Sequence, residues 1–138
     1  MDPLSITTGC LSLLSAISTA TRIVIDFIVS CREARDEITA VSRELSDLDI
    51  TLHILKHEAE ENELKRLPEG LRQYIRDIMV NCTTVLNDLD ALLREYKGTG
   101  LENATKWALF GCKEANKIRA SLEVHKRTLS LVVEAFTL

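Results

Sequence analysis

Two histidines and a glutamate in the first half of the chain have the spacing of a metal site. His53 and His57 are four residues apart, and Glu61 follows four residues later. On one helix these positions share a face, where imidazole and carboxylate groups can bind a divalent cation. The sequence offers no HExxH motif and no distant third ligand. We therefore favour an ordinary exposed pair of histidines over a metal site, and we expect no metal or other cofactor.

His125 is a second titratable residue in an unusual position. It interrupts an otherwise apolar repeat that consists of Ala115, Ile118, Leu122, Leu129, Val132 and Phe136. A buried, neutral imidazole at this position would make the fold sensitive to pH, because histidine titrates near neutrality. We favour a partly buried histidine that is hydrogen-bonded to a neighbouring helix.

Motifs of the common catalytic sites are missing from the sequence. The five glycines form neither GxGxxG nor GxxxxGK[ST], and no serine lies in a GxSxG motif. Carboxylate pairs such as Asp47 and Asp49 lie on charged helix faces, where solvation explains them. The cysteines are too far apart for a zinc knuckle or a CxxC motif; they are Cys10, Cys31, Cys82 and Cys112. We expect a protein without enzymatic activity in a reducing, cytoplasmic compartment.

Composition and charge are typical of a single helical domain. The chain has 138 residues, of which 46% are hydrophobic and 28% charged, so it is not intrinsically disordered. Five glycines and two prolines are too few for the many turns of an all-β chain. The net charge of −4 disfavours nucleic acid as a partner. We expect one domain over residues 1–138 that belongs to a longer protein.

Three segments carry apolar residues at alternating spacings of three and four. In the segment 32–60 this seam contains Ala34, Ile38, Val41, Leu45, Leu48, Leu52, Leu55 and Ala59. From Pro68 it contains Leu71, Ile75, Ile78, Cys82, Val85, Leu89, Leu92 and Tyr96, widened by Met79, Leu86 and Leu93. The third segment covers 103–138, with a break expected near Gly111. Because short connections make long helices antiparallel, the pattern predicts an all-α, up-down antiparallel bundle of four or five long helices.

The first thirty residues predict a further helix of unusual composition. Residues 3–21 carry no charge, although eight of these nineteen residues are Ser or Thr. One predicted apolar face contains Leu4, Leu11, Leu14, Ile17, Val24 and Ile28. The other contains Ile6, Cys10, Leu13, Ala20, Ile23 and Phe27. A helix that is apolar almost all round lies either at the centre of a bundle or in lipid; the hydroxyl groups make it more polar than a constitutive membrane span.

A basic stretch in the last segment is a second candidate surface. Its members are Lys106, Trp107, Lys113, Lys117, Arg119, Lys126 and Arg127. The cations could meet anionic lipid or an acidic partner, and tryptophan favours interfaces. They could equally offset the acidic segment 32–60 across the bundle, which we favour slightly.

Four patches of sequence resemble a known family when taken in order along the chain. They are Met1-Asp2-Pro3-Leu4-Ser5-Ile6 with Gly9, Ser42-Arg43-Glu44-Leu45 with Leu48, Trp107-Ala108-Leu109-Phe110, and His125-Lys126 with Leu129 and Leu131. They are similar to the N-terminal module of fungal STAND (NLR-like) proteins, which is also named after the azaphilone pigment cluster protein L. That module is similar to HeLo and HeLo-like domains, the helical bundles of fungal heterokaryon incompatibility and cell death, and to the executioner domain of the necroptosis pseudokinase.

The resemblance implies a cytosolic module ahead of an NTPase and a repeat sensor in the same polypeptide. In those relatives an apolar N-terminal helix leaves the bundle and attacks the membrane; by position, this helix is Leu4 to Val29 here. One hypothesis is therefore a death effector that self-associates, relocates to the plasma membrane and targets it with this helix. The alternative is a signalling and oligomerisation adaptor that recruits protein partners without touching membranes. The Ser and Thr content of the helix departs from the family's pattern.

Overall fold

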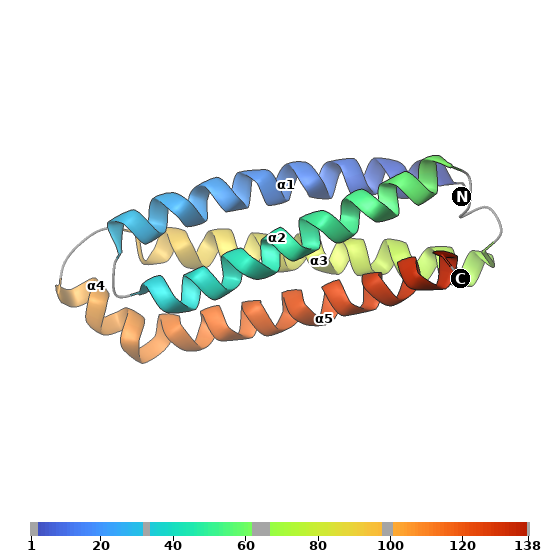
Figure 1. Ribbon diagram of the computed structural model, residues 1–138. Helices are drawn as coiled ribbons and strands as arrows, with labels where there is room; N and C mark the ends of the chain where they lie inside the picture. Colours follow the sequence, from blue (N-terminus) through green and yellow to red (C-terminus); the bar gives the residue numbers. More distant parts are fainter. Residues whose placement is uncertain (1–2, 32–33, 62–66, 98–100, 138) are drawn as a thin grey trace.

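Four long helices pack side by side in the computed structural model (Figure 1), which describes residues 3–31, 34–61, 67–97 and 101–137. The long helices are α1 (Pro3–Ser30), α2 (Arg35–Glu60), α3 (Glu69–Glu95) and α5 (Cys112–Thr137). A short helix, α4 (Leu101–Lys106), and a π-helical turn, η3 (Trp107–Gly111), come before α5. No strand occurs in the described ranges. The predicted all-α bundle is confirmed, and the break expected near Gly111 is the π-helical turn.

Successive long helices alternate in direction, as the short connections predict (Figure 1). The main packed pairs are α1 with α2, α1 with α3, α2 with α5, and α3 with α5. Two neighbouring pairs, α1 with α3 and α2 with α5, are therefore parallel, and α2 is not a main neighbour of α3. Connection length decides only that the helices alternate, whereas the apolar faces decide which of them touch.

The core is built from the predicted seams of α2, α3 and α5. All eight predicted seam residues of α2 are buried, from Ala34 to Ala59. In α3 the seam is buried from Ile75 to Tyr96, although Val85 is only partly buried and Leu71 is exposed. Near the end of α5 the seam shifts by one position, because Val133 is buried while Val132 is only partly buried. The side chain of Phe136 lies outside the described residues.

Candidate functional site

Helix α1 has a single buried stripe and not the two apolar faces expected from its sequence. The stripe is Ile6, Cys10, Leu13, Ile17, Ala20, Val24 and Phe27. These positions alternate at spacings of four and three, so they form the same kind of seam as in α2. The predicted division was wrong because it separated Ile17 and Val24 from the other members. Because only this stripe is buried, α1 packs against α2 and α3 on one side and faces solvent on the other.

The other candidate residues of α1 lie along the edges of this stripe or in solvent. Leu14, Ile23 and Ile28 are partly buried against the core, whereas Leu11 is exposed. The side chain of Leu4 lies outside the described residues. Two further residues, Ile25 and Val29, are exposed, and the sequence analysis had not included them. The solvent face of α1 therefore carries large apolar side chains next to its Ser and Thr residues.

Helix α1 has the length and composition of a helix that could cross a lipid bilayer, which core helices of soluble proteins can also have. Its segment Ile6–Ser30 is the one membrane-length apolar helix among the described residues. At 1.5 Å per residue its 25 residues extend for about 38 Å, more than the hydrocarbon core of about 30 Å. Several hydroxyls bond to the helix's own carbonyls: Thr19 donates to Ser15 O at 3.2 Å, and Ser30 donates to Asp26 O at 3.2 Å. These bonds lower the cost of moving the hydroxyls out of water.

A close contact with α3 positions the first half of α1. A Cβ atom added at Gly9 would lie 2.8 Å from the Cε atom of Met79, the flexible end of a side chain that can shift to make room. The Met79 thioether also lies 3.9 Å from the Cys10 thiol. Because methionine is flexible, this contact holds α1 without locking it rigidly.

An aromatic cluster positions the second half of α1. Trp107 is only 1% exposed and packs between Phe27 of α1 and Tyr96 at the end of α3. The ring centroids are 5.5 Å apart for Phe27 and Trp107, and 5.4 Å apart, edge to face, for Tyr96 and Trp107. Such separations suit attractive aromatic pairs. The sequence-based assignment of Trp107 to an exposed basic surface was therefore wrong, because the indole fills the end of the core.

The π-helical turn holds this indole in place. A Cβ atom at position 111 would lie 2.4 Å from the Cε3 atom of Trp107, so only glycine leaves room for the ring. π-helical turns are rare in proteins, and those that do occur are often found at functional sites. While Trp107 and Gly111 face inward, Leu109 and Phe110 between them are exposed. The turn thus separates its apolar side chains into a buried set and a solvent-facing set.

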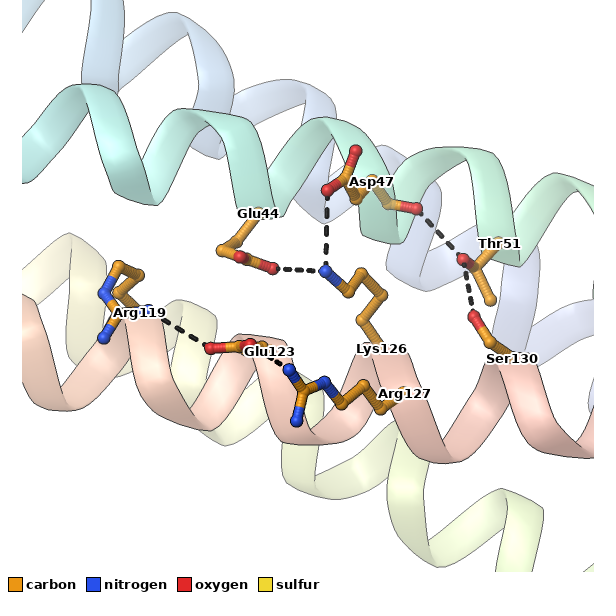
Figure 2. A network of polar contacts seen from close by, with 8 residues as sticks. All are labelled: Glu44, Asp47, Thr51, Arg119, Glu123, Lys126, Arg127 and Ser130. Atoms are coloured by element: carbon orange, nitrogen blue, oxygen red, sulfur yellow. Dashed lines mark hydrogen bonds and ion pairs between the residues drawn. The ribbon is translucent and has the colours of Figure 1, made fainter.

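Much of the predicted basic surface is paired within the bundle (Figure 2). Lys126 Nζ lies 3.0 Å from Glu44 Oε2 and 3.5 Å from Asp47 Oδ2, both on α2. The bond to Glu44 raises the pKa of Lys126. Lys126 thus offsets the acidic α2 in the way that the sequence analysis favoured. The other pairs stay within α5: Arg119 and Arg127 both bind Glu123, and Lys117 binds Glu114. Lys106 and Lys113 are both exposed.

Further polar contacts join α2 and α5 on either side of Lys126. The hydroxyls of Thr51 and Ser130 are 3.5 Å apart, and Thr51 donates to Asp47 O at 3.0 Å (Figure 2). Cys112 donates to Glu37 Oε1 at 3.2 Å, which raises the pKa of the Cys112 thiol. These bonds fix the register of two parallel helices, since sliding by one turn would leave their polar groups unpaired.

The three histidines differ in their surroundings. His53 Nδ1 lies 2.9 Å from Asp49 O and 3.5 Å from the Asp49 carboxylate, one turn earlier on α2. Within the described ranges, no three His, Cys, Asp or Glu side chains gather closely enough to hold a metal ion. His125 is partly buried, and this burial lowers its pKa.

The lowered pKa of His125 makes the stability of the bundle depend on pH. Because the unfolded chain binds a proton on this imidazole more tightly, stability is lost as pH falls from the ordinary value of 6.5 through the lower folded value. We expect the wild type to lose more free energy of unfolding than His125→Gln between about pH 7.5 and 5.5. Urea unfolding at both pH values measures this; His53 and His57 are present in both proteins and cancel. Equal losses would contradict the prediction.

An apolar groove opens between the start of α3 and the end of α5. It has a volume of about 330 Å³ and is lined by Leu67, Leu71, Tyr74, Thr128, Leu131, Val132 and Ala135. Its walls are almost entirely hydrocarbon, so it could receive an apolar side chain from another molecule.

Comparison with known proteins gives no relative for this chain. No family model, no curated protein and no solved structure matches it.

Proposed function

We propose that this protein is a non-enzymatic effector module whose helix α1 leaves the bundle and enters a membrane when several copies are brought together. The burial of α1 carries the proposal: the helix is long and apolar enough to cross a bilayer, yet only seven of its 25 residues from Ile6 to Ser30 are buried. Leu11, Ile25 and Val29 already face solvent. A move into lipid would bury apolar surface that the bundle leaves in water.

A single copy is expected to keep α1 packed in the bundle. Release would expose the buried stripe of α1 together with the facing seams of α2 and α3, and it would separate Phe27 from Trp107. The exposed hydroxyls of Ser12, Ser18 and Thr19 also make one isolated α1 a poor span. In an assembly these hydroxyls can bond across neighbouring helices. Insertion is therefore conditional on self-association.

The resemblance to fungal STAND modules supports a biological setting for this mechanism. We place the module in the cytoplasm, at the N-terminal end of an NLR-like receptor whose NTPase and repeat sensor drive self-association. Activation would move it to the plasma membrane, where α1 acts in regulated cell death or heterokaryon incompatibility.

A second candidate function is supported by the apolar groove between α3 and α5. In that case the bundle stays folded and recruits a protein partner, which would place an apolar side chain between Leu71, Tyr74 and Leu131. This adaptor would not need α1 to move, so it should leave lipid vesicles intact, whereas the proposed effector should make them leak.

Leakage from vesicles tests the proposed function. The chain is fused at its C-terminus to a trimeric coiled coil, which leaves α1 free, and is added to anionic vesicles that hold a fluorescent dye. We expect the trimers to release the dye and the monomer to release much less. Ile25→Asp should reduce release by the trimers, because it adds a second acidic group, next to Asp26, to the inserted helix. A charge costs about 3 kcal/mol at the centre of a span and less toward its end, where position 25 lies.

Ile50 of α2 provides the matched control. It is 57% exposed, as against 55% for Ile25, so aspartate at either position should leave the bundle folded. The buried Ile17 would be a poor choice, because aspartate there would unfold the protein whatever its function. Trimers of Ile50→Asp should still release the dye. Intact vesicles in the presence of wild-type trimers would favour the adaptor function.

A further inference from the structure

We propose that Arg76 of α3 sets how readily α1 leaves the bundle, because its guanidinium group is buried beside α1 with too few hydrogen-bond partners. This role presupposes the release of α1 proposed above. The packed state carries the cost of the unpaired N–H groups, and release of α1 removes that cost by admitting water. Arg76 therefore brings the packed and released states closer in free energy.

The guanidinium of Arg76 is buried with most of its donors unused. Among the described residues, Arg76 is the one buried residue that carries a charge, with 9% of its surface exposed. Its hydrogen bonds both use Nη2, which donates to Glu69 Oε1 at 2.8 Å and to Gln73 Oε1 at 2.9 Å. Nε and Nη1 are buried and have no partner in the part of the chain that the structure describes. Three of the five N–H donors are therefore unsatisfied.

The ion pair with Glu69 offsets little of this cost. The side chain of Glu69 is 54% exposed, so water competes for its carboxylate. Arg72, one turn before Arg76, binds the other oxygen of the same carboxylate at 2.8 Å. The Nε atom of Arg72 is also buried and has no partner in the described ranges. Two positive charges thus share one negative charge in a partly buried setting, where the excess charge is poorly solvated.

The geometry of α3 places Arg76 on the side of the helix that faces α1. Arg94 follows eighteen residues later, which is five full turns, so both side chains leave α3 in the same direction. Arg94 lines a hollow between α1 and α3 together with Asp26 of α1. Leu71 and Tyr74, in contrast, line the groove towards α5. Arg76 therefore lies on the α1 side of α3.

The register of the two helices places Arg76 beside the first turns of α1. Met79, one turn after Arg76, has its Sδ atom 3.9 Å from the Cys10 thiol. Helices α1 and α3 run in the same direction (Figure 1), so Arg76 lies at the level of Ile6, one turn before Cys10. Ile6 is fully buried. When α1 leaves, this side of α3 opens to water, and the unsatisfied N–H groups gain partners.

Arg76→Met tests this role, because methionine is a flexible apolar residue without a charge or N–H groups. We expect the equilibrium constant for unfolding in urea to fall about tenfold, since removal of a poorly compensated buried charge commonly stabilises a fold. In the monomer without urea, iodoacetamide should label Cys10 about tenfold more slowly, because α1 must open to expose this buried thiol. Mass spectrometry distinguishes Cys10 from the other cysteines. Dye release by trimers should slow by a similar factor.

Arg94→Met is the matched control. Arg94 lies on the same side of α3, but its side chain is 74% exposed and its bond to Asp90 joins residues one turn apart. This variant should change unfolding, labelling and dye release by less than about twofold.

The role of Arg76 is overturned if Arg76→Met leaves the labelling of Cys10 unchanged, or if Arg94→Met slows it as much. Where wild-type trimers release dye, equally fast release by Arg76→Met trimers overturns it too. Wild-type trimers that leave vesicles intact would refute the proposed function alone, because the labelling of Cys10 in the monomer still shows whether Arg76 favours the opening of α1.

Discussion

Replacing Trp107 with alanine should lower the free energy of unfolding by about 3–5 kcal/mol, the usual cost of removing a large buried aromatic side chain. The indole is only 1% exposed and packs on both Phe27 and Tyr96, so three segments of the chain would lose a common contact. Its Nε1 atom has no hydrogen-bond partner, so the loss comes from packing and not from a broken bond. Urea unfolding followed by circular dichroism measures the effect.

Two variants separate this packing from other effects. Trp107→Phe keeps an aromatic ring and removes the unpaired N–H group, so it should cost much less than Trp107→Ala. Phe110→Ala removes an aromatic side chain from the same turn, but an exposed one, and should change stability by less than about 0.5 kcal/mol. A loss for Trp107→Ala as small as that for Phe110→Ala would contradict the role of the cluster.

The same cluster links stability to the proposed release of α1. Because Phe27 is the α1 residue in contact with the indole, Trp107→Ala removes part of what holds the second half of α1 in the bundle. Trimers of this variant should therefore release dye from anionic vesicles at a lower protein concentration than wild-type trimers.

The seam of α2 shows which parts of the fold a sequence can predict. Leu45, Leu48 and Leu52 were expected in the core and are buried, because charged residues flank them and only one face is left for packing. In α1 nearly every face is apolar or neutral, so periodicity alone could not decide which face packs. The buried face could have been identified from Ile6, Cys10, Leu13 and Ile17, because they follow the same alternating spacing of four and three as the seam of α2.

The candidate site shows what a one-dimensional pattern leaves open. The sequence shows three large apolar side chains in a row of four residues, at Trp107, Leu109 and Phe110. The geometry of the π-helical turn buries Trp107 and leaves Leu109 and Phe110 exposed. The pairing of Lys126 with Glu44 depends on which helices are neighbours, and the parallel contact of α2 with α5 does not follow from connection lengths. Gly111 directly follows Trp107-Ala108-Leu109-Phe110, and the backbone and the Trp107 ring approach closely there.

A distance measured between α1 and α2 tests the central claim that α1 leaves the bundle. The two helices are antiparallel neighbours, so the first half of α1 lies beside the second half of α2 (Figure 1). Ser12 and His57 are exposed positions in these halves, and each can be changed to cysteine and spin-labelled. Cys10, Cys31 and Cys82 are buried, whereas the partly exposed Cys112 would be replaced by serine.

Double electron–electron resonance on this labelled chain, mixed with unlabelled chain to suppress distances between copies, gives the decisive result. The monomer in solution should show one short distance, set by the packed helices. Trimers on anionic vesicles should show a second population, separated by more than the width of the bundle, that grows as the dye is released. Dye release by trimers that retain only the short distance would contradict the account, because the membrane would then be breached with α1 still in place.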